Sequence, residues 1–450
     1  MRKLPELLMP AGNLEKLKFA YAYGADACYA GVPAYSLRAR ENEFKIETIA
    51  ESVEYAHKLG KKIYLTNNII PHNRKIDGYL RALDQMVELK PDAFIMSDIG
   101  MIHLTKQRYP DLEIHLSVQA NVVNWATAKY WHEVVGVKRI ILSRELAISE
   151  IAEIHAKVPT LELEAFVHGA ICMAYSGRCL LSNYFNHRDA NQGICTNACR
   201  WEYKVIQKVN PDFGEKLFYD LNVSDEPYQP LPDNVEYYIE QVNRPGELNL
   251  IDEDEHGTYI MNAKDLCAIE HLQELADAGV CSFKVEGRSK SIYYVQQVAR
   301  AYRMAIDALY TDKVKEAAQE GLKEVYAHSN RGFTTGFLLR NPKEYGQNYA
   351  HGESEYSTHA YLGVVRAYDK EKKMALVEPK NRFEVGTLIE WIHPEWGVKS
   401  AMLNEMYDQK YNPISVVHGG TKPVWIPCEY ELNEFSMLRQ PLIELPVIQG

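Results

Sequence analysis

The sequence predicts an α/β protein: a (β/α)8 barrel of the TIM type, followed by a small antiparallel β-barrel domain. Three observations lead to this prediction. Short apolar runs alternate with helical segments, no glycine-rich phosphate-binding loop follows any run, and the sequence pattern changes near residue 340. Strands that alternate with helices indicate a parallel sheet, and eight such units close into a barrel.

The expected strands are apolar runs of about four to eight residues, bounded mostly by polar residues, glycine or proline. Such runs are typical of strands that are buried on both faces of a parallel sheet. Seven of them lie at 5–10, 26–31, 61–68, 92–98, 113–119, 139–144 and 163–169. An eighth run at 282–288 follows a long interruption and precedes a strongly helical segment.

The segments between these runs carry apolar residues at helical spacing, as in residues 46–62 and 126–138. Asn13 and Ser149 are expected helix N-caps, and Gly24 is an expected helix terminator. An open doubly wound sheet is the alternative to the barrel. The barrel is favoured because no GxGxxG or GxxxxGK[ST] motif follows any expected strand.

The domain organisation follows from composition. The barrel is expected over 1–340, with an inserted segment at about 205–258 that is rich in Pro, Asp and Glu and holds a few short strands. Residues 355–450 alternate apolar and polar positions, with turns at 369–373 and 380–381. This alternation predicts a C-terminal antiparallel β-barrel module.

Composition limits the possible classes of protein. With 450 residues and 46% apolar residues, the chain has enough material for a large core, which excludes a disordered protein. No uninterrupted apolar stretch of ~18 residues is present and the N-terminus lacks a secretory signal, so we expect a cytoplasmic protein without membrane contact. The net charge of −11 argues against a general nucleic-acid coat, although a local basic patch is compatible with it.

Four of the eight cysteines fall within 28 residues, with the spacing C-x6-C-x15-C-x3-C. They are Cys172, Cys179, Cys195 and Cys199. They follow the seventh strand, so the barrel would bring them to its catalytic face. Four thiolates suit zinc or an iron–sulfur cluster. Because only the second pair is tightly spaced, a [4Fe–4S] cluster is favoured over zinc. The other cysteines are better explained as buried apolar residues, with Cys267 as a reserve ligand.

Polar side chains occupy the carboxyl ends of most expected strands, where they would line a pocket for a small polar ligand. We assign His168 and Glu286 as candidate catalytic residues, although His168 also fits a buried structural histidine. Guanidinium groups suit a dicarboxylate ligand. The candidate substrate-binding residues are Asn67, Gln119, Asn121, Arg144, Arg178 and Arg288. Ordinary capping better explains Asn68, Ser97 and Ser143.

The stretch EAFVHGAICMAYSGRCLLS (164–182) resembles the signature of the collagenase-like peptidase family U32. The resemblance extends to residues 6–31, 195–203 and 284–295 and to the C-terminal module, so it covers nearly the whole chain. Within this family, the full-length form is similar to the prephenate-dependent tRNA uridine hydroxylases. Family members of this kind convert the wobble uridine of the anticodon to 5-hydroxyuridine.

The resemblance implies a fold, a cofactor and partners. It implies a [4Fe–4S] cluster on Cys172, Cys179, Cys195 and Cys199, with Cys267 in reserve because some relatives take one ligand from elsewhere. It also implies prephenate as co-substrate and the tRNA anticodon loop as partner. Arginines and aromatic residues that suit RNA contact are Tyr35, Arg38, Arg40, Arg178, His187, Arg188, Arg200 and Trp201.

Two other functions remain open at this stage. The family name suggests a peptidase, but neither GxSxG nor HExxH occurs in the sequence. A Cys172 nucleophile with His168 as its base is conceivable, yet a cysteine peptidase has no use for three further thiols nearby. The third hypothesis is an RNA-binding scaffold with structural zinc. The sequence gives no prediction of oligomeric state.

Overall fold

The computed structural model describes most of the chain. The described residues are 2–37, 43–171, 196, 203–208, 218–220, 236–241, 248–251, 264–328, 330, 332–339 and 357–442. In the strands between 203 and 251, the description covers the backbone.

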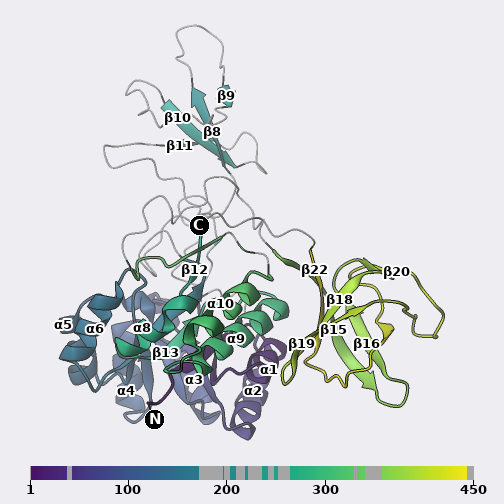
Figure 1. Cartoon of the computed structure of the whole chain (residues 1–450). Coiled ribbons are helices and arrows are strands. Elements are labelled where there is room, and N and C mark those ends of the chain that lie inside the picture. Colours follow the sequence, from purple (N-terminus) through teal and green to yellow (C-terminus); the bar gives the residue numbers. More distant parts are fainter. Residues whose placement is uncertain are drawn as a thin grey trace.

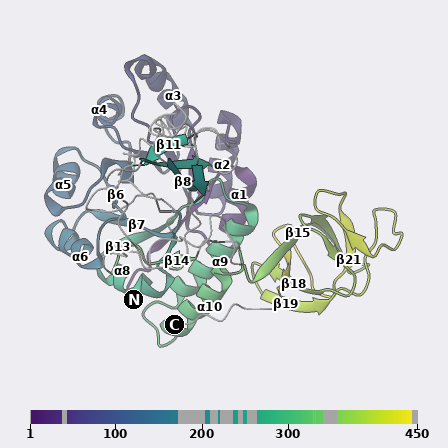
Figure 2. The ribbon, with the colours of Figure 1, turned by 90° about the horizontal axis from the view of Figure 1, so that it is seen from above.

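Eight parallel strands form a closed barrel, as the sequence predicts (Figure 2). They are β1 (Glu6–Ala11), β2 (Ala27–Gly31), β3 (Lys62–Asn67), β4 (Ala93–Met96), β5 (Ile114–Leu116), β6 (Arg139–Ile141), β7 (Glu162–Gly169) and β13 (Val280–Val285). Strand β13 closes the ring, because it pairs in parallel with both β1 and β7. An open sheet is therefore excluded.

Helices surround the barrel (Figure 1). They are α1 (Leu14–Ala22), α2 (Ile46–Lys58), α3 (Ile76–Glu88), α4 (Ile99–Arg108), α5 (Trp125–Lys129), α6 (Ile148–Lys157), α8 (Leu272–Asp277), α9 (Ile292–Asp307) and α10 (Val314–Val325). Within the described residues, none of the helices has the length and apolar character needed to cross a membrane.

The expected helix ends are confirmed in two cases and wrong in one. The Asn13 side chain accepts a hydrogen bond from the Lys16 N–H at 2.9 Å, and Gly24 adopts φ 99° just after α1. Ser149 is not an N-cap, because α6 already begins at Ile148. There the Glu150 carboxylate accepts the N–H of Ala147, the residue before the helix, at 2.8 Å.

Two short strands that the sequence analysis did not predict extend the sheet at the barrel mouth. Strand β12 (Asp265–Cys267) runs antiparallel to β7 and places Cys267 opposite His168. Strand β14 (Phe333–Thr334) pairs with β12 in parallel. The chain just before the cysteine-rich segment is therefore paired on both sides, by β13 and by β12.

Within the expected insertion, four strands form a separate antiparallel sheet (Figure 1). They are β8 (Tyr203–Lys208), β9 (Phe218–Asp220), β10 (Glu236–Gln241) and β11 (Leu248–Ile251). Their order is β11-β10-β8-β9. Figures 1 and 2 place this sheet beyond the barrel mouth, on the side where β12 lies.

The C-terminal module is antiparallel, as expected. Its strands are β15 (His359–Asp369), β16 (Met374–Pro379), β17 (Phe383–Glu384), β18 (Leu388–His393), β19 (Gly397–Met402), β20 (Val416–Val417), β21 (Val424–Pro427) and β22 (Met437–Pro441). Six of them form one curved sheet in the order β19-β18-β22-β15-β16-β21. Within the described residues, β19 and β21 are the two edge strands and do not pair with each other. The module is therefore a half-barrel around its own apolar core.

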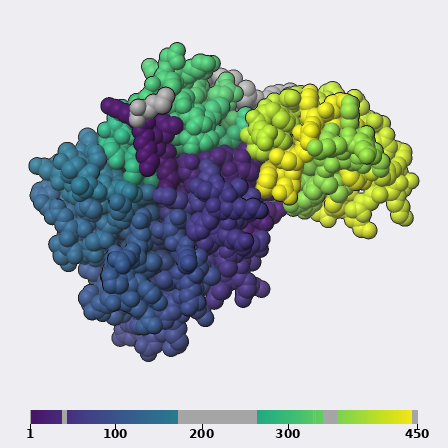
Figure 3. Space-filling model, turned by 90° about the horizontal axis from the view of Figure 1, so that it is seen from below, coloured from purple at the N-terminus to yellow at the C-terminus, as the bar shows by residue number. Residues whose placement is uncertain are grey.

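The half-barrel packs against the side of the large barrel (Figure 3). The hydroxyl of Tyr23, just after α1, donates a hydrogen bond to the main-chain carbonyl of Phe435 at 2.8 Å. The rings of Phe19 and Phe435 pack edge-on, with their centres 5.4 Å apart. A buried ion pair joins Arg439 of β22 to Glu324 of α10 at 3.0 Å. Apolar and ionic contacts therefore fix the position of the module.

Candidate functional site

The interior of the barrel holds a network of paired charges. Glu164 of β7 is fully buried and accepts hydrogen bonds from Lys284 at 2.8 Å and from Arg139 at 3.2 Å. Arg139 also contacts Glu6 at 2.7 Å. Ser282 donates to both carboxylates, at 3.0 and 3.2 Å. Charges so far from water persist only when they are paired, and here each one has a partner.

The protonation of this network follows from its geometry. Burial favours a raised pKa for the Glu164 carboxyl, but the cations of Lys284 and Arg139 outweigh burial and hold the pKa below its ordinary value. Burial lowers the pKa of the Lys284 amine, and the neighbouring Glu164 opposes this effect only in part. The barrel therefore holds a lysine that releases its proton more easily than a lysine in water.

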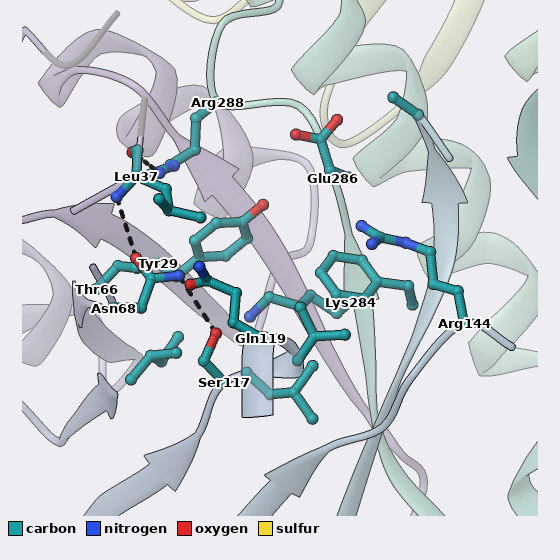
Figure 4. A pocket seen from close by; sticks show the side chains of 15 residues that line it. Tyr29, Leu37, Thr66, Asn68, Ser117, Gln119, Arg144, Lys284, Glu286 and Arg288 are labelled. Carbon is teal, nitrogen blue, oxygen red and sulfur yellow. Dashed lines mark hydrogen bonds between the residues drawn. The ribbon is translucent and has the colours of Figure 1, made fainter. Parts of the chain in front are cut away.

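A cavity of about 140 Å³ lies at the carboxyl ends of the strands, with Lys284 in its wall (Figure 4). It is lined by Tyr29, Leu37, Thr66, Asn68, Ile95, Ser117, Val118, Gln119, Ile141, Arg144, Phe166, Ala170, Lys284, Glu286 and Arg288. Four of the predicted site residues, Gln119, Arg144, Glu286 and Arg288, thus lie around one space. The pocket is where the barrel fold places active sites.

Lys284 is the main residue of this cavity that the sequence analysis missed. Side chains alternate along a strand, so Lys284, Glu286 and Arg288 continue one inward-facing series from β13. A lysine within an otherwise apolar strand was the available signal. Its amine lies 4.0 Å from the centre of the Tyr29 ring and 5.8 Å from that of Phe166.

Gln119 gives the cavity an amide with both polar atoms unused. It is 2% exposed, and neither its amide nitrogen nor its amide oxygen has a hydrogen-bond partner within the described part of the chain. Asn121 adopts a left-handed backbone conformation with φ 53°. Its side-chain amide donates a hydrogen bond to the main-chain carbonyl of Gln119 at 2.9 Å, which fixes this turn. Buried amides are normally hydrogen-bonded, so Gln119 points to a polar ligand. Asn121 itself supports the turn and does not line the cavity.

The cationic groups of the cavity come from two strands, β6 and β13, and the residues that follow them. The Arg144 guanidinium lies 3.8 Å from the centre of the Phe166 ring, and Arg288 donates to the Leu37 carbonyl. With Lys284, they set three cations against the Glu286 carboxylate in the cavity wall. Asn68, expected as a capping residue, also lines the cavity while it accepts from the Leu37 N–H at 3.1 Å. The balance favours an anionic ligand.

His168 lies beside the cavity but not in its wall. It is fully buried among the rings of Tyr294, Tyr302, His328 and Phe333, and its Nδ1 is 3.3 Å from the Tyr302 hydroxyl. Burial, reinforced by His328, holds the pKa of His168 well below its ordinary value, so the ring is neutral. Its catalytic role stays a prediction. Asn67 is likewise buried outside the cavity wall.

The four clustered cysteines lie outside the described residues, as do Arg178 and the other expected RNA-contact residues except Tyr35. The ring of Tyr35 packs edge-on against that of Tyr79, with the ring centres 5.6 Å apart. Within the described residues, no three His, Cys, Asp or Glu side chains are grouped to hold a metal ion. Ala170, which lines the cavity, and Ile171 are the last described residues before the cysteine-rich segment in the sequence.

Cys267 is described and lies opposite His168 in the sheet. Its thiol is buried, 3.7 Å from the Tyr302 hydroxyl, and burial raises its pKa to about 11. In this environment Cys267 is a neutral thiol. Its reserve role as a metal ligand stays a prediction.

Comparison with known proteins gives consistent matches along the chain. The model of peptidase family U32 matches residues 12–348, and that of the U32 C-terminal domain matches residues 357–439. "tRNA hydroxylation protein P" of Escherichia coli strain K12 is 46% identical, covering 97% of this chain and 96% of that protein. The protein of the same name from Haemophilus influenzae is 43% identical, with coverage of 98% and 96%. A "Collagenase" of Porphyromonas gingivalis is 29% identical, with 80% of each chain covered.

Proposed function

The chain belongs to peptidase family U32, and we propose that it is a tRNA-modifying enzyme that hydroxylates C5 of the wobble uridine, with prephenate or a related metabolite as co-substrate. The observation that carries the proposal is the 46% identity, over nearly the full length of both chains, to a protein named for tRNA hydroxylation. A tRNA substrate would place the protein in the cytoplasm.

The cavity supports a small anionic co-substrate. Prephenate carries two carboxylates and a ketone, and the wall offers Arg144, Lys284 and Arg288 as cations with Gln119 as an amide. Guanidinium groups bind carboxylates through two parallel hydrogen bonds. The volume of about 140 Å³ is below the ~300 Å³ at which pockets for drug-sized ligands begin. It suits a metabolite better than a folded peptide segment.

The uridine would enter from the barrel mouth. A base in an anticodon loop is already single-stranded, so turning it out of the loop costs only a few kcal/mol or less. The described residues at the mouth then have two tasks. The cations hold the co-substrate, and the apolar side chains Tyr29 and Phe166 limit the access of water to it.

The chemistry of the donor set fits an iron–sulfur cluster. Cys172, Cys179, Cys195 and Cys199 would hold it, and in the sequence they follow the end of β7 at Gly169. Thiolates are the usual ligands of such clusters. When bound, the cluster would supply electron transfer or Lewis-acid activation for the hydroxylation.

Anaerobic purification and nucleoside analysis test both parts of this proposal. The pure protein should be brown, absorb near ~400 nm and contain iron and sulfide, as expected of a thiolate-bound cluster. Cys172→Ser should lose the colour, and 5-hydroxyuridine derivatives should vanish from the tRNA of cells that carry only this variant. Cys428→Ala, in the core of the C-terminal module, is the control and should keep both. Unchanged tRNA in a deletion strain without a paralogue would contradict the proposal.

Peptidase activity is the second candidate, favoured by the relative that is named "Collagenase". Incubation of the holoprotein with casein or denatured collagen separates the two functions. We expect no cleavage above that of a Cys172→Ser variant. Robust cleavage that this variant abolishes would reverse the ranking.

A further inference from the structure

The most informative group outside the expected site is the buried amine of Lys284. Among the described residues that line the cavity, only Lys284 carries a primary amine. We propose that this amine forms an imine with the carbonyl carbon of a 2-oxo acid bound in the cavity. The inference rests on the proposed function in one respect: prephenate is a 2-oxo acid.

The surroundings of Lys284 suit a nucleophilic amine. The residue is 3% exposed, and its nitrogen lies above the Tyr29 ring at 4.0 Å, so water has little access to it. A desolvated lysine is the usual form of an imine-forming residue. Lys284 is among the residues that line the cavity (Figure 4), so a 2-oxo acid bound there would contact its side chain.

Glu164 supplies the base that the reaction needs. Its carboxylate lies 2.8 Å from the amine and accepts the ammonium proton, which leaves a neutral amine to attack the carbonyl carbon. The Lys284 ammonium is the strongest of the charges that lower the pKa of Glu164, so this pKa rises once the proton has moved. The new C–N bond gives a carbinolamine. The C–O bond then breaks, and the oxygen leaves as water with the proton returned by Glu164. Overall, the ammonium and the ketone give a protonated imine and one water, so atoms and charge balance.

The same wall offers a partner for the acid group of the ligand. The guanidinium of Arg144 lies 3.8 Å from the centre of the Phe166 ring, and the Lys284 amine lies 5.8 Å from it. The two cations therefore border one aromatic side chain. A 2-oxo acid carries its carboxylate and its ketone on adjacent carbons, so Arg144 can bind the first while Lys284 takes the second. The Gln119 amide, which has no hydrogen-bond partner among the described residues, remains for the rest of the ligand.

A purely structural ion pair explains less. Glu164 also accepts hydrogen bonds from Arg139 and Ser282, both at 3.2 Å, so it has other partners inside the barrel besides Lys284. An ion pair that only stabilised the barrel would not require Lys284 to line a cavity, whereas a reactive amine requires this position.

Reductive trapping tests the inference. The anaerobic holoprotein is incubated with prephenate or phenylpyruvate, reduced with sodium borohydride and mapped by peptide mass spectrometry. We expect one adduct per chain, on the peptide that contains Lys284. Lys284→Arg keeps a cation beside Glu164 and should give no adduct. Lys138→Arg, which replaces an exposed lysine, should give the same adduct as the wild type.

The outcomes separate this inference from the proposed function. If the wild type forms 5-hydroxyuridine with prephenate but no adduct is trapped, the imine is wrong and the proposed function stands. If the adduct forms while tRNA stays unmodified, the imine stands and the proposed function fails. A Lys284→Arg variant with full hydroxylation activity would overturn the inference as well. Circular dichroism of this variant checks that it is folded.

Discussion

The amine of Lys284 lies 2.8 Å from a carboxylate oxygen of Glu164, and both side chains are almost completely buried. Lys284 belongs to β13 and Glu164 to β7, the eighth and seventh strands of the barrel, which pair in parallel. The pair links the ionic network inside the barrel to the wall of the cavity. Glu164 belongs to the buried network, and Lys284 lines the cavity.

Removal of the Glu164 carboxylate should destabilise the protein strongly. Glu164→Ala leaves Lys284 without its anion in a place without water, which costs about 3–5 kcal/mol for a buried pair. Glu162→Ala is the matched control, because Glu162 also pairs with Arg139 but is 33% exposed, and it should cost less than ~1 kcal/mol. Urea denaturation measures both. Equal losses of unfolding free energy in the two variants would contradict the larger cost assigned to the buried carboxylate.

Gln119→Met should separate stability from ligand binding. The substitution keeps the side-chain length and removes two buried polar atoms that have no hydrogen-bond partner among the described residues, so the free energy of unfolding should stay equal or rise. The rise in melting temperature caused by prephenate should disappear. Gln296→Met is the control, because the buried Gln296 amide also has no partner in the described part of the chain but does not line the cavity. Loss of the prephenate effect in both variants would contradict the assignment.

The stability of the protein should fall in acid because of the buried histidines. Burial lowers the pKa of His328 to about 3, against about 6.5 for an unfolded histidine. Between these values the unfolded state binds the proton and the folded state does not. The contribution of His328 to the free energy of unfolding is therefore fully present above pH 6.5 and is lost as the pH falls towards 3.

The substitution His328→Phe tests this account. At pH 4.5, two units below 6.5, the wild type should lose about 2.7 kcal/mol through His328 alone. The variant should lose less stability than the wild type between pH 7.5 and 4.5, by roughly this amount. His103→Phe removes an exposed histidine and should leave the loss unchanged. Urea denaturation at the two pH values measures the loss of unfolding free energy in each protein. Equal losses for the wild type and His328→Phe would disprove the account.

Two arginines join the half-barrel to the large barrel, and they should differ in importance. Arg439 is 4% exposed and contacts Glu324 at 3.0 Å and Glu390 at 2.6 Å. Its loss leaves two nearly buried carboxylates together, so Arg439→Ala should cost about 3–5 kcal/mol. Arg366 contacts Glu15 at 2.7 Å but is 36% exposed, so Arg366→Ala should cost less than ~1 kcal/mol. Thermal and urea unfolding would show the difference, and a reversed order would contradict it.

Most barrel elements could be predicted from the sequence because each has a local signal. The eight strands are continuous apolar runs, and Asn13 precedes its helix as a capping residue. Strands β12 and β14 span only three and two residues, too short to show a period. Ser149 was misjudged because serine and glutamate compete for the same helix start, and the Glu150 carboxylate reaches the Ala147 N–H.

The site was predicted in part for the same reason. Gln119, Arg144, Glu286 and Arg288 follow strand ends, and strand ends of a parallel barrel meet at one face. The sequence by itself determined the barrel, its order of strands and the place of the cysteine-rich segment after β7. Only the tertiary structure decided that Lys284 meets Glu164, 120 residues away. The parallel pairing of β13 with β7 sets their register across the long interruption in the sequence, and register selects which side chains face each other in the interior.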